Sequence, residues 1–238
     1  METKLLNQAS GRTAAITASL VAAIALLAMI IVATPSEAAS GGVGLGLVGN
    51  TGNNTGNNNA NGKCKKANLG KRTLKKGSCG QDVLTLHWFL RAKKLDSASG
   101  KVFADRTERA VIDFQQDANL EPTGVVNKAT VAAVKKTMSK GKASWYGPGF
   151  FGNRTACGKK LKKKTIGVAV PVEKAKKFPC GTKVLLNYKG RWVRARVIDT
   201  GGFGKYGRKW DLTSHTAKLL NKNWKSDGVF TVRAAVQK

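Results

Sequence analysis

The 238-residue sequence is poor in acidic residues and in histidine. It has 13 Asp and Glu against 42 Lys and Arg, a formal net charge of +29, and only two histidines. Its four cysteines form no Cys-x-x-Cys pair, which argues against a zinc site, and we expect neither a metal nor a cofactor. Helix-turn-helix and zinc-finger patterns are also absent. The charge therefore predicts a polyanionic partner without specific recognition of nucleic acid.

Residues 1–39 have the layout of a segment that directs export. Lys4 and Arg12 precede an apolar stretch from Thr13 to Ala33, and small residues follow it. This layout favours a signal cleaved after Ala38, and the length of the apolar stretch makes an uncleaved membrane anchor the alternative. With either outcome the body of the protein lies outside the cytoplasm, in the envelope or beyond it, and meets a membrane only through this segment.

Cysteines in an exported chain indicate disulfides. Four cysteines allow three connectivities. Locality in the sequence favours Cys64 with Cys79 and Cys157 with Cys180, because each pair then falls within one predicted domain.

The remaining chain divides by pattern into a tether and two domains. Residues 40–62 are rich in Gly and Asn and too poor in large apolar residues to form a core. Residues 63–138 have helical spacing, with a third short helix expected around Thr130 to Val134. A basic joint at 139–142 leads to short strands in 143–238. These patterns predict a small helical domain and then a small, mainly-β closed barrel.

The helical domain resembles the three-helix peptidoglycan-binding family. The resemblance rests on Leu74-x-x-Gly77-x-x-Gly80-x-x-Val83-x-x-Leu86-x-x-Phe89-Leu90, a Thr107 cap, the core motif Ala110-Val111-x-x-Phe114-Gln115, and Leu120, Gly124 and Thr130. The sequence departs from the family at His87, where Gln is usual, and at Thr123 and Asn127. We expect His87 to be a packed or surface residue, not a ligand.

In the second domain, local signals predict a hairpin, a helix and an acidic site. Lys189-Gly190 should link two strands, and Thr213 should cap a helix from Ser214 to Leu220. The run up to Asp199 alternates, with Val193, Ala195 and Val197 on one face and Trp192, Arg194 and Arg196 on the other. Asp199 shares the apolar parity, so we expect it on the core side of a half-buried strand, at a groove lined by the following glycines.

This second domain resembles the six-stranded double-psi β-barrel of the rare lipoprotein A (RlpA) family and, more distantly, expansins. The resemblance rests on Ala143-Ser144-Trp145-Tyr146-Gly147-Pro148-Gly149-Phe150, Gly152-Asn153-Arg154-Thr155-Ala156-Cys157-Gly158, Phe178-Pro179-Cys180-Gly181-Thr182, Val197-Ile198-Asp199 and Trp210-Asp211-Leu212-Thr213. RlpA relatives are lytic transglycosylases that cleave peptidoglycan glycan strands with a Glu and the Asp at the position of Asp199. Here the Glu position holds Lys159, and Val170 stands near the place of the family's histidine.

The resemblance implies an exported protein that binds peptidoglycan and anionic wall polymers and remodels glycan. Asp199 could act alone as the acid/base group, with Asp211 orienting it, because the sugar's own hydroxyl is the nucleophile in transglycosylation. Alternatively the barrel binds glycan without cutting it, as expansins do. A third alternative is that the positively charged protein binds extracellular DNA.

Aromatic and polar residues around the motif blocks are candidates for substrate binding, and about half of the aromatic rings should fill the barrel instead. The candidates are Trp145, Tyr146, Thr155, Lys159, Phe203, Tyr206 and Trp210. The lysines of the run from Lys159 to Lys164 form either a solvated loop or a clamp on the carboxylates or phosphates of the wall.

Overall fold

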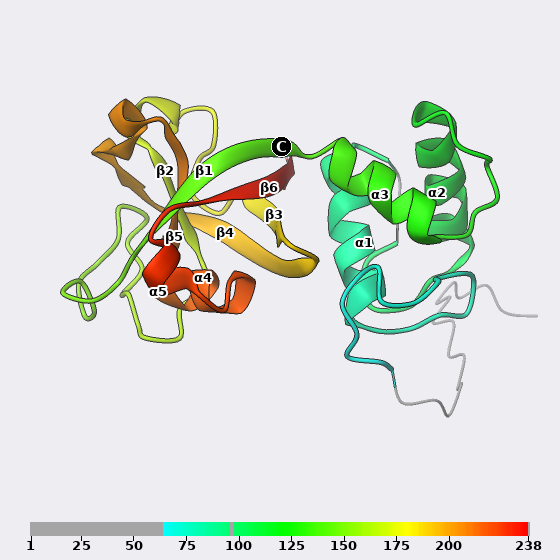
Figure 1. The fold of residues 1–238 in the computed structure, drawn as a ribbon, viewed down its shortest axis with the longest axis horizontal. Helices are drawn as coiled ribbons and strands as arrows, with labels where there is room; N and C mark the ends of the chain where they lie inside the picture. The colour runs from blue at the N-terminus through cyan, green and yellow to red at the C-terminus, as the bar shows by residue number, and fades with distance from the viewer. Residues whose placement is uncertain (1–63, 96–97, 238) are drawn as a thin grey trace, which may run out of the picture. The chain divides into compact units, whose positions relative to one another are not determined.

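The computed structural model describes residues 64–95 and 98–237, which belong to one compact unit. Three helices, α1 (Gln81–Ala92), α2 (Asp105–Asp117) and α3 (Lys128–Lys136), precede a closed six-stranded barrel (Figure 1). The predicted fold class is confirmed. The predicted export segment and tether lie outside the described residues. Within the described residues, no helix combines the length and the hydropathy needed to cross a membrane.

The helical part is built on apolar residues that recur at helical spacing. Phe89 of α1 and Phe114 of α2 meet edge to face, with ring centroids 5.0 Å apart. The predicted short helix falls inside α3, which begins after Asn127. The side chain of Asn127 accepts a hydrogen bond from the Thr130 backbone N–H at 2.9 Å and so caps this helix.

Thr107 and His87 form a buried pair in this core. Thr107 is not the predicted cap, because Ala104 occupies the N-cap of α2 and Thr107 lies within the helix. Its hydroxyl lies 2.8 Å from His87 Nε2, and His87 Nδ1 lies 3.1 Å from the Gly100 carbonyl oxygen. His87 is fully buried, and burial is the main reason that its pKa falls to about 4. His87 is therefore a neutral, packed histidine.

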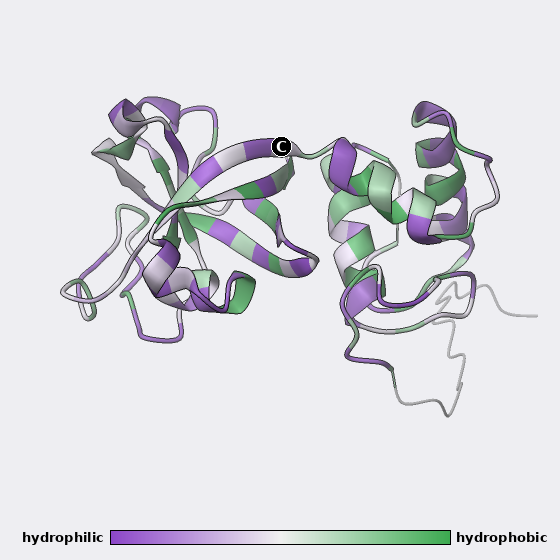
Figure 2. Cartoon of the chain, viewed as in Figure 1, coloured by the Kyte–Doolittle hydropathy of each residue, from purple (hydrophilic) through white to green (hydrophobic). Residues whose placement is uncertain are grey.

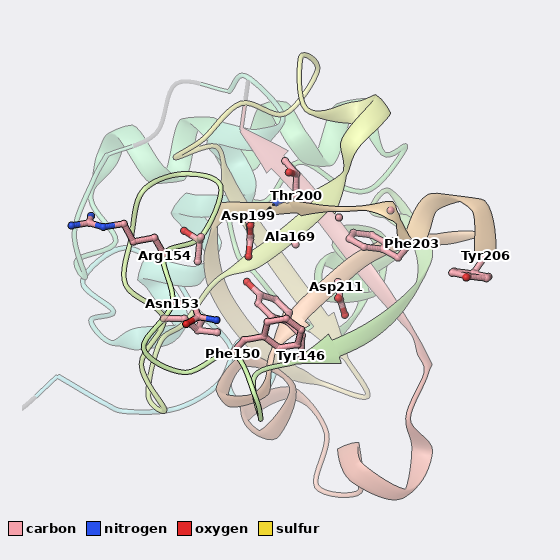
Figure 3. A pocket seen from close by; sticks show the side chains of 14 residues that line it. Tyr146, Phe150, Asn153, Arg154, Ala169, Asp199, Thr200, Phe203, Tyr206 and Asp211 are labelled. Carbon is pink, nitrogen blue, oxygen red and sulfur yellow. Dashed lines mark hydrogen bonds between the residues drawn. The ribbon is translucent and has the colours of Figure 1, made fainter.

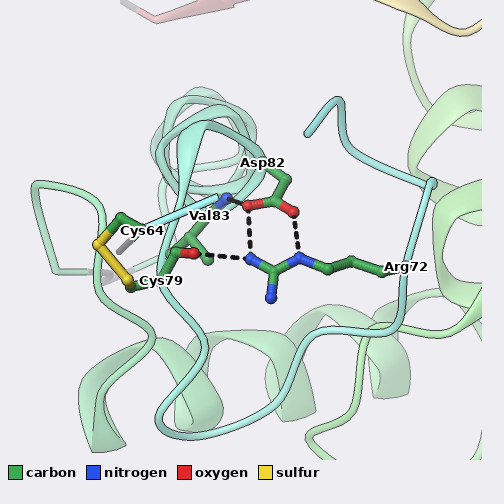
Figure 4. Close-up of a disulfide and its surroundings, with 5 residues drawn as sticks. All are labelled: Cys64, Arg72, Cys79, Asp82 and Val83. Atoms are coloured by element: carbon green, nitrogen blue, oxygen red, sulfur yellow. Dashed lines mark hydrogen bonds and ion pairs between the residues drawn. A yellow bond between two sulfur atoms is a disulfide. The ribbon is translucent and has the colours of Figure 1, made fainter. Parts of the chain in front are cut away.

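Both predicted disulfides are present, Cys64–Cys79 and Cys157–Cys180. The first lies beside an ion pair between the partly buried Arg72 and the buried Asp82 (Figure 4). Arg72 Nε donates to Asp82 Oδ2 at 2.7 Å, and Arg72 Nη2 donates to the Cys79 carbonyl at 2.7 Å. Each disulfide closes a short loop and should stabilise the fold by about 3 kcal/mol on the loop-entropy account.

The barrel strands run in the order β1-β5-β2-β4-β3-β6. The β1/β5 and β2/β4 pairs are parallel and the other pairs are antiparallel. The strands are β1 (Ser139–Tyr146), β2 (Val168–Pro171), β3 (Lys183–Tyr188), β4 (Arg191–Gly201), β5 (Arg208–Thr213) and β6 (Phe230–Gln237). Short helices between them are η1 (Val172–Lys174), η2 (Gly202–Tyr206), α4 (Ser214–Leu220) and α5 (Trp224–Asp227).

Most local signals in the barrel sequence are confirmed. Lys189 and Gly190 take positive φ angles of 45° and 81° in the hairpin between β3 and β4. Helix α4 begins after Thr213, whose side chain accepts a hydrogen bond from the Thr216 N–H. One expectation differs from the structure: residues 139–142 are not a joint but the first half of β1, which pairs with β6.

Strand β4 alternates in hydropathy along its length (Figure 2). Val193, Ala195 and Val197 face the barrel core, as predicted. The opposite face is not simply exposed, because Trp192 is only 9% exposed and packs in the core cluster of the helices. Its indole N–H donates to the Leu69 carbonyl at 2.9 Å. This part of β4 is therefore covered on both faces.

Candidate functional site

A bulge in β4 determines where Asp199 points. Val168 of β2 pairs with Val197, and the next residue, Ala169, pairs with Asp199. Strand β4 thus has one residue more than β2 at this point, Ile198, and the alternation is interrupted. Asp199 falls on the face of Ala169, outside the apolar core that holds Val168 and Val197. The predicted placement of Asp199 on the core side is wrong for this reason.

The same face brings a second carboxyl into line with Asp199. Ala169 also pairs with Asp211 of β5, and Asp211 pairs with Ser144 of β1. Four neighbouring strands therefore present Asp199, Ala169, Asp211 and Ser144 in one row. Neighbouring strands lie about 4.8 Å apart, so the backbones of the two aspartates are about 10 Å apart. The small side chain of Ala169 leaves space between their carboxyls.

This row lies in a pocket of about 350 Å³ (Figure 3). The pocket combines the two carboxyls, aromatic rings and the glycine turn that follows Asp199. Its lining is Tyr146, Phe150, Asn153, Arg154, Thr155, Leu161, Ala169, Asp199, Thr200, Gly201, Gly202, Phe203, Tyr206 and Asp211. Among the residues that the structure describes, no group of three or more His, Cys, Asp or Glu could hold a metal ion.

Two backbone donors hold Asp199. Its Oδ1 accepts hydrogen bonds from the N–H of Ala156 at 2.8 Å and of Thr200 at 3.0 Å. The Ala156 bond ties the loop before Cys157 to the end of β4. Because both bonds use one carboxyl oxygen, the other oxygen remains for a ligand, and in Figure 3 the carboxyl points into the pocket towards Tyr146.

Asp211 is more readily protonated than an ordinary aspartic acid. Burial raises its pKa above the usual value, and the nearby charge of Asp199 adds a smaller rise. A hydrogen bond from Ser144 Oγ at 2.8 Å and the charge of Arg208 act in the opposite direction. Burial is the largest of these effects, so Asp211 keeps its proton to a higher pH than an ordinary aspartic acid.

Tyr146 places a phenol beside both carboxyls. Its hydroxyl is buried and has no hydrogen-bond partner among the described residues. Burial, and then the charge of Asp199, raises the pKa of this phenol above its usual value. An interaction of the hydroxyl with the Asp199 carboxyl also raises this pKa. The neutral hydroxyl thus faces Asp199 inside the pocket and can donate to an oxygen of a ligand there.

The pocket contains only some of the predicted binding residues. Tyr146, Thr155, Phe203 and Tyr206 line it, whereas Trp145, Lys159 and Trp210 do not. Trp145 packs against Trp224 with ring centroids 4.4 Å apart, Trp210 is buried in the barrel core, and the side chain of Lys159 is exposed.

Sequence reasoning missed several residues of the site. Asn153 and Arg154 belong to a motif block that was recognised, so their spacing from Thr155 could have suggested them. Ser144 also belongs to a motif block. Ala169 carries no signal of its own, and its place follows only from the pairing of β2 with strands that are distant in sequence.

Parts of the chain are similar to known proteins. Residues 79–134 match the family described as "Putative peptidoglycan binding domain". A 97-residue stretch is 36% identical to the "Probable endolytic peptidoglycan transglycosylase RlpA" of Synechocystis sp., covering 40% of this chain and 28% of the relative. The predicted two-part resemblance is confirmed, although the chain spans less than a third of that relative's length.

Solved structures also align with part of the chain. One is a mutant expansin of Clavibacter michiganensis in complex with cellohexaose, at 18% identity and a TM-score of 0.36, covering 43% of this chain and 51% of that one. Another is a papain inhibitor of Streptomyces, at 24% identity and a TM-score of 0.33, covering 42% of this chain and 97% of the inhibitor.

Proposed function

We propose that this is an exported cell-wall protein that binds peptidoglycan and cleaves its glycan strands as a lytic transglycosylase. The peptidoglycan-binding domain and the RlpA relative support the choice of polymer. The observation that carries the proposal of cleavage is the row of two carboxyls on either side of Ala169, inside a pocket with aromatic walls. Enzymes that break glycosidic bonds commonly use two carboxyl groups whose different surroundings give them different pKa values.

The two carboxyls take different parts in this mechanism. Asp211, with its raised pKa, donates a proton to the glycosidic oxygen as the bond from the sugar's C1 to that oxygen breaks. Asp199 removes the proton from the C6 hydroxyl of the same sugar, and the oxygen of that hydroxyl then bonds to C1. The products are a 1,6-anhydro sugar and a new chain end. Water is not consumed, and the proton lost from Asp211 is balanced by the one gained by Asp199.

Other pocket groups position the sugar. The buried Tyr146 hydroxyl can donate to a ring substituent beside Asp199. Phe203 is a buried part of the lining, and Tyr206 is 63% exposed at its edge. Lys205 and Arg208 lie 5.2 and 5.3 Å from the centre of the Tyr206 ring, so the ring and these cations together can contact a neighbouring sugar of the strand. These contacts favour a polymer that extends beyond the pocket over a single sugar unit.

A second candidate is glycan binding without cleavage, in the manner of expansins. Lys159 favours it, because an ammonium cannot serve as the acid that the family's Glu supplies, and its side chain does not line the pocket. Under this alternative Asp199 and Asp211 accept hydrogen bonds from sugar hydroxyls.

Mass spectrometry of sacculi incubated with the full-length protein tests the proposal, and we expect 1,6-anhydro products. Lys159→Glu should raise their yield, because it places a carboxyl at the family's Glu position, next to the pocket-lining Thr155. The Thr155 N–H donates to the Lys159 carbonyl, and the Thr155 hydroxyl accepts from the Lys159 N–H. If neither wild type nor Lys159→Glu releases anhydro sugars while both sediment with sacculi, cleavage is refuted and the non-cutting alternative stands.

A further inference from the structure

The loop after β1 contributes to a second concave surface besides the pocket. Phe150 lines the pocket, while the next residue, Phe151, lines a separate groove of about 350 Å³. We call this surface the lysine groove and define it by Phe151, Lys163, Lys164, Lys218, Trp224 and Lys225. Neither Asp199 nor Asp211 belongs to it, so it is distinct from the proposed catalytic site.

The lysine groove concentrates positive charge from three separate segments. Lys163 and Lys164 come from the loop before β2, Lys218 from α4 and Lys225 from α5, and all are exposed. No Asp or Glu lines the groove. Across residues 64–95 and 98–237, the salt bridges involve Arg72 and Lys76 and none of these lysines. The groove therefore keeps an uncompensated positive potential that attracts an anionic chain.

The kind of cation in the groove suits a chain of phosphodiesters. Arginine binds both carboxylates and phosphates with two parallel hydrogen bonds, whereas lysine is a regular phosphate binder that acts as a compact point charge and needs no fixed geometry. The groove holds lysines and no arginine. Point charges distributed along a groove suit a chain of singly charged phosphodiesters, each of which needs proximity to a cation more than a fixed fork.

The aromatic residues of the groove argue against nucleic acid. Proteins that bind single strands present ring faces on which bases stack. Here the Trp224 ring already contacts Trp145 at 4.4 Å between centroids, and Lys225 Nζ lies 5.6 Å from its centre. Trp224 is also half-buried, so little of its face is free for a base. Phe151 and the exposed part of Trp224 instead offer apolar contact to the short carbon units between phosphates.

We propose that the lysine groove is a binding site for a linear phosphodiester polymer with small polyol units, such as a glycerol-phosphate chain of a cell wall. This inference goes beyond glycan cleavage, because it uses a different surface and a different chemistry. It gives the protein two anchors on a wall, one for peptidoglycan and one for a phosphate polymer.

The test measures binding of the full-length protein to a synthetic glycerol-phosphate oligomer by calorimetry over a range of salt concentrations. The groove variant carries Lys164→Gln, Lys218→Gln and Lys225→Gln. A matched control carries Lys136→Gln, Lys140→Gln and Lys176→Gln, which removes the same charge from exposed lysines outside the groove. Poly-glutamate and duplex DNA of equal charge serve as comparison ligands.

We expect the groove variant to lose affinity by about 30-fold or more and to show a shallower salt dependence, because three phosphate contacts are lost. The control should change by about threefold at most. Equal losses in both variants would mean that only overall charge matters, and tighter binding of DNA or poly-glutamate than of the phosphate oligomer would also overturn the proposal. Anhydro-sugar release should be unchanged in the groove variant, which separates this test from that of glycan cleavage.

Discussion

Replacing Asp199 with Asn isolates the chemical role of its carboxyl from its structural role. The asparagine side chain keeps a carbonyl oxygen that can still accept the Ala156 and Thr200 N–H groups, at 2.8 and 3.0 Å in the wild type. What it loses is the ability to take up and release a proton. We therefore expect the free energy of unfolding to fall by less than about 1 kcal/mol.

The effect on catalysis should be much larger. A positioned acid/base group contributes about 10²- to 10⁴-fold to a rate, which corresponds to roughly 3 to 5.5 kcal/mol of transition-state stabilisation. Anhydro-sugar release by Asp199→Asn should fall within this range while sedimentation with sacculi stays close to wild type. Quantitative mass spectrometry of released products and a pelleting assay measure the two quantities on the same sample.

Asp199→Ala provides the comparison. It removes the acceptor as well as the proton, so both N–H groups lose their partner and the loop before Cys157 loses its tie to β4. We expect a further loss of about 1–2 kcal/mol in stability, limited because the Ala156 bond is exposed to solvent. The reasoning fails if Asp199→Asn retains more than half of the wild-type rate, or if it binds sacculi no better than an unfolded control.

Three further outcomes follow from the structure. Asp211→Asn should reduce release by a similar factor and abolish the decline in rate that wild type shows as pH rises through the raised pKa of Asp211; an unchanged pH profile would contradict its role as proton donor. His87→Gln should remove a loss of stability on acidification. The pKa of His87 is about 4 in the folded state and 6.5 in the unfolded state, so the wild type loses up to about 3 kcal/mol of unfolding free energy as pH falls from 6.5 towards 4. Urea unfolding of both proteins at the two pH values measures this loss, and an equal loss in wild type and variant would contradict it. Asp82→Ala should cost about 2–3 kcal/mol in the same assay, since it leaves the partly solvated Arg72 without its carboxylate, and a cost below about 0.5 kcal/mol would show that the pair adds little.

The sequence predicts the parts of the fold that local chemistry determines. Thr213 followed by helical spacing identifies α4 with its cap, and Lys189-Gly190 identifies a hairpin, because each signal acts within a few residues. The disulfides follow from locality for the same reason. Phe203 and Tyr206 reach the pocket because they belong to the turn that directly follows Asp199.

What the sequence does not predict depends on pairing between distant strands. The parity of Asp199 fails because a bulge is a property of two strands, and the sequence of β4 alone does not reveal it. The alternating pattern places Trp192 on the polar face of β4, but in the structure the helical part covers it. Trp210 resembles a ligand-stacking aromatic by its motif, yet its register opposite Ala143 places it in the core.

Because of the bulge at Ile198, the position of the Asp199 carboxyl depends on the number of residues between Val197 and Asp199 more than on their identity. Another apolar residue in place of Ile198 preserves the count, and both aspartates stay beside Ala169. Deleting that single residue would instead turn Asp199 towards the barrel interior and direct its neighbour outward. The chain would keep every side chain used by the proposed chemistry and lose their alignment, so in this segment an insertion or deletion matters more than most substitutions.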